Sequence, residues 1–157
     1  MPVTPRVAFI IAASMAALLM LDDTPGISAK NATFVGSEAC GQCHPDEYER
    51  YSTHSKKARS ARHVTQMAPD LKPFELAKCF ECHATGYGQP GGFVSLEATP
   101  HLANAGCEVC HGAGSLHAES GDISLIALPT LKDCEHCHNE ARVASFGFKP
   151  LIHAGAH

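Results

Sequence analysis

The order of the cysteines constrains this chain more than any other feature of its sequence. All eight cysteines fall into four C-x-x-C pairs, and a histidine directly follows each pair. The cysteines are Cys40, Cys43, Cys79, Cys82, Cys107, Cys110, Cys134 and Cys137, and the histidines after them are His44, His83, His111 and His138. C-x-x-C-H is the attachment motif of c-type haem. The repeated motif predicts four covalently attached haem c groups, each with its motif histidine as the proximal iron ligand.

Two other kinds of site use paired cysteines. Two tetrahedral Cys₄ zinc sites would account for the eight thiols, but zinc gives no reason for a histidine immediately after every pair. Disulfides or thioredoxin-like redox pairs would suit an oxidising compartment, but no βαβ pattern surrounds any of the pairs. Haem attachment is the interpretation that explains every cysteine and every motif histidine together.

The composition limits the size and class of the protein. The chain has 157 residues, enough for one ordinary domain, and its formal charge of −4 argues against nucleic-acid binding. Aromatic residues make up only 6% and tryptophan is absent, so side chains alone would form a thin core. We therefore expect a mainly α protein with long loops, a small multihaem cytochrome c fold wrapped around four closely packed haems.

The N-terminal segment has the pattern of an export signal. Arg6 precedes an uninterrupted apolar or small run over 7–21, and Ser28-Ala29 offers small residues for cleavage. We interpret residues 1–29 as a signal peptide and 30–157 as the tetrahaem domain, which predicts a periplasmic or other extracytoplasmic location. The alternative is an uncleaved membrane anchor, although the run is short for a spanning helix.

Local patterns around the first two motifs predict the following structure. Pro45 suits a first helical position, and apolar or small residues then recur at three- and four-residue spacings, which predicts a helix from about Pro45 to Arg62. The glycine-rich stretch 86–92 predicts a loop. The alternation over Phe93–Glu97 is typical of a short strand.

Capping residues predict short helices near the last two motifs. Thr99 with Pro100 predicts a helix that runs into the third motif, and Thr130 predicts one that runs into the fourth. Ser115 and Gly121 bracket a short turn that contains His117.

The histidines outside the motifs decide whether each haem iron has a second axial ligand or keeps that position open. Two axial histidines make a haem an electron carrier, whereas an open position can bind a small molecule. His136 lies inside a motif spacer, beside its own haem edge, and is a poor distal ligand. The remaining candidates for the four distal positions are His54, His63, His101, His117, His153 and His157.

Longer stretches around the motifs resemble one known family. The runs Cys79–Phe93, Thr99–Leu102, Gly106–His117 and Ser37–His44 are similar to segments of the tetrahaem cytochrome c-554 family. The likeness extends from about Gly36 to Asn139, well beyond the motifs themselves. It implies roles in nitrogen-cycle or other anaerobic respiratory chains.

The resemblance also implies distal ligands. The family histidine that matches His117 binds the first haem, and the one that matches His54 binds the third. A late histidine, best matched by His153 and then by His157, binds the fourth. The second haem, on His83, is five-coordinate in some members.

The chain departs from the family pattern in three places. Tyr51 stands where relatives often have tryptophan, the stretch between the third and fourth motifs is short, and little chain follows the fourth. His101, just ahead of the third motif, is our sequence-based candidate for the sixth ligand of the second haem, with His63 as the next choice.

These features predict a carrier that relays single electrons between respiratory redox partner proteins by outer-sphere transfer, not an enzyme. One alternative is a reductase of nitric oxide, nitrite or peroxide at an open haem. Another is a subunit of a stacked-haem filament, which would make the chain a homo-oligomer. Membrane association is expected only through an uncleaved N-terminal segment.

Overall fold

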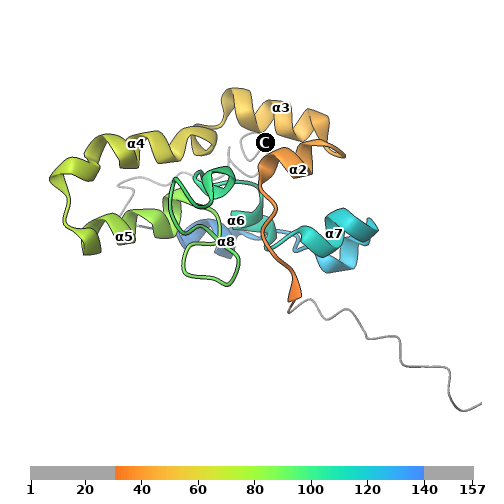
Figure 1. Cartoon of the computed structure of the whole chain (residues 1–157). Coiled ribbons are helices and arrows are strands. Elements are labelled where there is room, and N and C mark those ends of the chain that lie inside the picture. Colours follow the sequence, from red (N-terminus) through yellow and green to blue (C-terminus); the bar gives the residue numbers. More distant parts are fainter. Residues whose placement is uncertain (1–30, 140–157) are drawn as a thin grey trace, which may run out of the picture.

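The computed structural model describes residues 31–139, and this part of the chain is helical without any strand (Figure 1). The predicted class, mainly α with long loops, is confirmed. The α-helices are α2 (Ser37–Gly41), α3 (Pro45–His54), α4 (Ser60–Met67), α5 (Pro73–His83), α6 (Glu108–His111), α7 (Ser115–Ser120) and α8 (Leu131–Glu135). Short 3₁₀ turns are η3 (Lys56–Arg59), η4 (Ala68–Asp70), η5 (Pro100–Leu102) and η6 (Ile123–Leu125). The proposed signal, 1–29, lies outside the described residues, as do His153 and His157.

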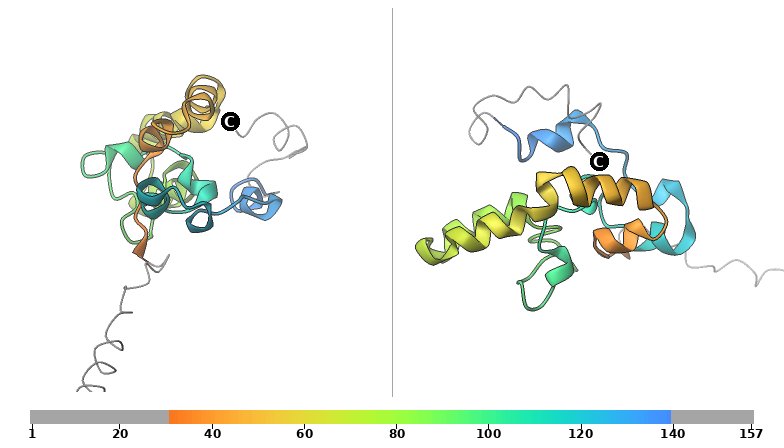
Figure 2. Two further views of the ribbon diagram at one scale, coloured as in Figure 1. Left: turned by 90° about the vertical axis from the view of Figure 1, so that its right-hand side faces the viewer. Right: turned by 90° about the horizontal axis from the view of Figure 1, so that it is seen from above.

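The predicted single helix over Pro45–Arg62 is wrong, because the chain breaks at Ser55. Ser55 is extended, with ψ of 129°, and its side chain accepts a hydrogen bond from Lys57 N, so it ends α3 and caps η3. The helix then resumes as α4 and continues past Arg62 to Met67. Figure 2 shows α3 and α4 running nearly end to end, with α8 to one side of them.

Helices α4 and α5 pack against each other and carry the second motif. Pro73 occupies the first turn of α5, and Glu75 accepts a hydrogen bond from Lys72 N, so the helix start is well specified. Ser60 Oγ at the start of α4 donates to the carbonyl oxygen of His83 at the end of α5, 2.9 Å away. This hydrogen bond connects the start of α4, which follows the break after α3, to the histidine of the second motif.

The hydrophobic core of the described chain is small. Its buried members are Phe34, Ala61, Ala84, Phe93, Leu102 and Ala103, with Phe80, Tyr87 and Ala113 packed against them. Phe80 and Phe93 make the closest aromatic contact, with ring centres 4.8 Å apart. Large side chains such as Phe74 and Met67 remain more than half exposed. The side chains therefore leave apolar surface that a porphyrin could cover.

The predicted loop over 86–92 is present, but the expected strand over Phe93–Glu97 is not. Phe93 N donates to the carbonyl oxygen of Thr85, and Thr85 N donates to that of Leu102, so Thr85 bridges two segments without starting a ladder. Val94 N is bound by the side chain of Thr99. That contact ends any strand pairing after a single residue.

The capping predictions near the last two motifs have mixed outcomes. The helix expected after Thr99 is only the turn η5, because Ala103–Gly106 is not helical and α6 begins separately at Glu108. Thr130 does cap α8, in a reciprocal pair with Asp133. Ser115 and Gly121 bound α7 as predicted, and Gly121 takes the left-handed conformation that ends it. No helix in 31–139 is long and apolar enough to cross a membrane.

Candidate haem-binding site

Each C-x-x-C-H motif lies in or at the end of a helix. The amide of His44 donates to the carbonyl oxygen of Cys40, and His111 and His138 repeat this bond with the first cysteines of their own motifs. The second motif forms the last turn of α5. Residues three apart on a helical turn share one side, so both thiols of a pair face the same way. That arrangement suits two bonds to one porphyrin edge.

None of the eight motif cysteines forms a disulfide bond, and every one of them lies in the described range. Within residues 31–139 no group of three or more His, Cys, Asp or Glu side chains converges in a way that could hold a metal ion. The cysteines therefore form neither disulfides nor Cys₄ clusters in this fold.

His44 and His117 face each other although they are far apart in the sequence. Their ring centres are 6.3 Å apart and their planes differ by 20°. Metal–imidazole bonds of about 2.0–2.1 Å put the centres of two rings on opposite sides of one metal ion about 6 Å apart. The separation of His44 and His117 therefore fits an iron bound between them, and the residues present fit a haem on Cys40 and Cys43.

Hydrogen bonds fix the orientation of two of these imidazoles. His117 Nδ1 donates to the carbonyl oxygen of Asp122 at 3.0 Å, and His111 Nδ1 donates to that of Ala127 at 2.9 Å. A proton on Nδ1 leaves Nε2 as the metal-binding nitrogen, which is the usual arrangement of histidine ligands. Both rings are thus prepared to bind iron through Nε2.

The first and third motifs meet at Cys40 and Cys107. Their thiols form a hydrogen bond, which lowers the pKa of Cys107 to about 6 and raises the pKa of Cys40. Burial and the negative charge of Glu108 raise the pKa of Cys40 further. Because each cysteine belongs to a different motif, haems attached to these two motifs would have adjoining edges.

The charge of Lys57 acts on both the third and the fourth motif. Burial raises the pKa of Cys110 against the opposing charge of Lys57, and the nearby Cys134 raises it as well. Burial lowers the pKa of His138, and the charge of Lys57 lowers it further. The same cation therefore lies near both motifs.

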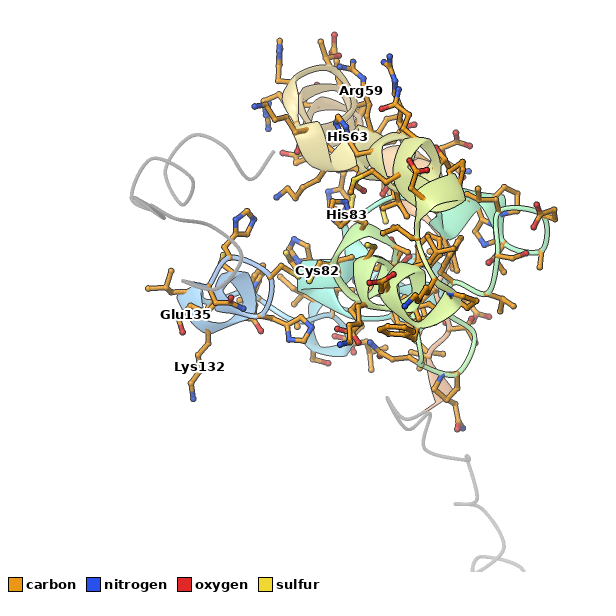
Figure 3. All side chains as sticks on the ribbon, turned by 90° about the vertical axis from the view of Figure 1, so that its left-hand side faces the viewer. Arg59, His63, Cys82, His83, Lys132 and Glu135 are labelled. Carbon is orange, nitrogen blue, oxygen red and sulfur yellow. The ribbon has the colours of Figure 1, made fainter. Side chains whose placement is uncertain are left out.

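The second motif, in the last turn of α5, lies next to α4. His83 Nδ1 is buried and has no hydrogen-bond partner among the described residues. His63 lies one helical turn after Ser60, which binds the backbone of His83. Figure 3 shows His63 on α4 above His83 at the end of α5. This places an exposed imidazole on the side of α4 that meets the second motif.

The remaining sequence candidates are spread over the fold. His54 is the exposed last residue of α3. His101 is exposed in η5, and its ring lies against Gly36, where an added Cβ would come within 3.3 Å of it. Sequence reasoning missed Glu108, whose buried carboxylate links three segments. Nothing in the sequence singles it out, because Glu81 and Glu135 also occupy motif spacers.

Comparisons with known proteins find sequence relatives among multihaem cytochromes. The family described as cytochrome c554 and c-prime matches residues 39–112, which include the first three motifs. The chain is 32% identical over 115 residues to cytochrome c-554 of Nitrosomonas europaea, covering 66% of this chain and 49% of that protein. It is 23% identical over 159 residues to the multiheme cytochrome MtrC of Shewanella baltica, covering 79% of this chain and 23% of that protein.

The chain thus spans about half the length of the first relative and less of the second. No solved structure matches it significantly. The motifs and the sequence matches together support a multihaem cytochrome of the cytochrome c-554 family, with covalently bound haem c.

Proposed function

We propose that this chain carries four haem c groups and relays single electrons between protein redox partners without bond chemistry of its own. The proposed number of haems follows from the eight cysteines, all of which lie in complete attachment motifs. When bound, each haem supplies an iron that alternates between ferric and ferrous states. The chain's own residues attach the porphyrins, supply axial ligands and exclude water around them.

The facing rings of His44 and His117 are the observation that carries the proposal. If a haem is attached at Cys40 and Cys43, His44 and His117 would hold its iron from opposite sides and leave no position for a substrate. An iron closed in this way exchanges electrons without binding a substrate. The hydrogen bond from His117 Nδ1 to Asp122 holds the distal ring in this orientation.

The other irons receive their ligands from the remaining histidines. We assign His111 and His54 to the third haem, as the family resemblance implies. His138 binds the fourth, with His153 or His157 as its distal ligand, both outside the described residues. For the second haem we place His63 ahead of His101, because the Ser60–His83 hydrogen bond brings the His63 side of α4 to the end of α5.

The contacts between motifs support an electron path. Cys40 touches Cys107, which joins the first haem edge to the third. Lys57 and the neighbouring Cys134 link the third motif to the fourth. We propose that electrons pass from haem to haem along this series. The second haem, held where α4 meets α5, would exchange electrons with the series from that side. We further propose an extracytoplasmic location, with 1–29 as the export signal.

Replacement of His117 tests the proposal directly. The wild-type first haem should be low-spin, and His117→Ala should produce one high-spin haem that binds carbon monoxide when reduced. His136→Ala is the matched control, because His136 is an exposed histidine that we assign to no iron. Electron paramagnetic resonance and absorption spectra would measure both variants. Unchanged spectra for His117→Ala would contradict the ligand assignment that carries the proposal.

A further inference from the structure

Glu108 is a buried carboxylate in the spacer of the third motif. Its residue is only 2% exposed, and no salt bridge involving it is present in the described chain. A buried acidic group is costly unless hydrogen bonds compensate it. The donors that surround Glu108 therefore indicate what the residue does.

All of its donors are backbone amides. Oε2 accepts from Gly36 N at 2.8 Å, and Oε1 accepts from Gly114 N at 2.8 Å. Val35 N contacts both oxygens, at 3.0 and 3.1 Å. The donors come from two segments, 35–36 and 114, that are far apart in the sequence and meet at this carboxylate and at the neighbouring Thr33–Ser115 pair.

Each of those segments leads directly to one of the facing imidazoles. Gly36 is the N-cap of α2, which carries the first motif toward His44. Gly114 is the N-cap of α7, and His117 follows three residues later. One carboxylate therefore binds the entry points of both helical segments that present the rings 6.3 Å apart.

We infer that Glu108, although it belongs to the third motif, is a positioning residue that sets the separation of His44 and His117 across the first haem. The inference rests on the proposed function, in which these two histidines bind one iron. Glu108 acts through backbone amides and touches neither ring. Loss of its acceptors would let α7 shift relative to α2 and weaken the His117–iron bond.

The neighbouring contacts should preserve the fold when Glu108 is changed. Thr33 N donates to Ser115 Oγ at 2.8 Å, and Ser115 N donates to the carbonyl oxygen of Thr33 at 3.1 Å. These bonds join the same two segments independently of the carboxylate. A Glu108 variant should therefore attach its haems and differ in ligand geometry.

The test is Glu108→Gln in the haem-loaded protein. Glutamine offers one acceptor oxygen in place of two, and its amide group would face N–H donors. We expect an unchanged haem count, a new high-spin fraction, and carbon monoxide binding at one reduced haem that is faster by about tenfold, the ratio set by one lost charge-assisted hydrogen bond. Glu135→Gln is the matched control, since Glu135 holds the same spacer position in the fourth motif and is exposed.

A double variant identifies the haem that responds. If Glu108 acts through His117, adding Glu108→Gln to His117→Ala creates no second high-spin haem. A second high-spin haem in the double variant, or a Glu108→Gln protein that matches Glu135→Gln, would overturn the inference. If His117→Ala alone leaves all haems low-spin, the proposed ligand assignment fails instead. Should Glu108→Gln fail to accumulate, Glu108→Asp keeps the charge with a shorter reach and should show a smaller change in the same direction.

Discussion

The hydroxyl group of Tyr51 donates a hydrogen bond to the carbonyl oxygen of Ala105 across 3.2 Å. On the other side of the same residue, Ala105 N donates to Ser60 Oγ at 2.8 Å. Ala105 lies two residues before Cys107, so side chains from α3 and α4 hold the approach to the third motif. Tyr51 thus supplies a hydrogen bond that helps to place the third C-x-x-C-H motif.

Removal of this hydroxyl group should destabilise the protein measurably. Tyr51 is 7% exposed, so Tyr51→Phe leaves the Ala105 carbonyl without one buried donor and should cost about 1–2 kcal/mol of unfolding free energy. Tyr48→Phe is the control, because no hydrogen bond of the Tyr48 hydroxyl group is present in the described chain. Chemical denaturation followed by far-UV circular dichroism would measure both variants. Equal midpoints for the two would show that the Tyr51 bond contributes nothing.

Tyr51 should also give the stability a dependence on alkaline pH. Burial raises its pKa from 10.0 to about 12 in the folded protein. A raised pKa means that the stabilisation from the neutral phenol is complete below pH 10 and is lost as the pH rises toward about 12. The stability difference between wild type and Tyr51→Phe should therefore narrow over this interval. A constant difference from pH 9 to about 12 would contradict the raised pKa.

Gly86 and Gly88 allow a matched test of packing in the loop after the second motif. Both have positive φ, 66° and 77°, so alanine at either one should cost about 1–2 kcal/mol of backbone strain. At Gly86 an added Cβ would also lie 2.6 Å from the Phe34 ring, whereas Gly88 has open space. Gly86→Ala should therefore cost about 3 kcal/mol or more in total. Denaturation midpoints would measure the difference, and equal losses would refute the Phe34 contact.

The sixth ligand of the second haem can be assigned with two single variants. We expect His63→Ala to create one high-spin haem and His101→Ala to leave all spin states unchanged. The reason is that His63 shares a side of α4 with Ser60, which binds His83, while the ring of His101 lies against Gly36. Electron paramagnetic resonance of the oxidised proteins would decide. A high-spin haem in the His101→Ala protein alone, or already in the wild type, would contradict the assignment of His63.

The sequence predicted the elements whose signals are local. Thr130 and Asp133 form a reciprocal cap that specifies the start of α8 without help from the rest of the chain. The break at Ser55 could not be predicted in the same way, because the apolar spacing of the first helix continues across it into 58 and 61. A serine side chain bound to Lys57 N was enough to interrupt that pattern. The start of α5 was missed although Pro73 and Glu75 mark it.

The residues of the candidate site also fall into two groups, those predicted from local sequence and those that depend on contacts between distant segments. Motif spacing alone predicts which cysteines and proximal histidines attach each haem. The facing of His44 and His117 depends on the contact between α2, α7 and the Glu108 carboxylate, which no spacing encodes. The resemblance to relatives implied that pairing, which stays a prediction, and the separation of the two rings is compatible with it.

The mass of the intact protein tests the central claim most directly. Protein made in a host with haem-attachment machinery should have the mass of its polypeptide, after any signal cleavage, plus four haem groups, with no thiol left to react. All eight cysteines would then be thioethers, as the four complete motifs require. A mass with fewer than four haems, together with two or more reactive thiols or bound zinc, would contradict the account.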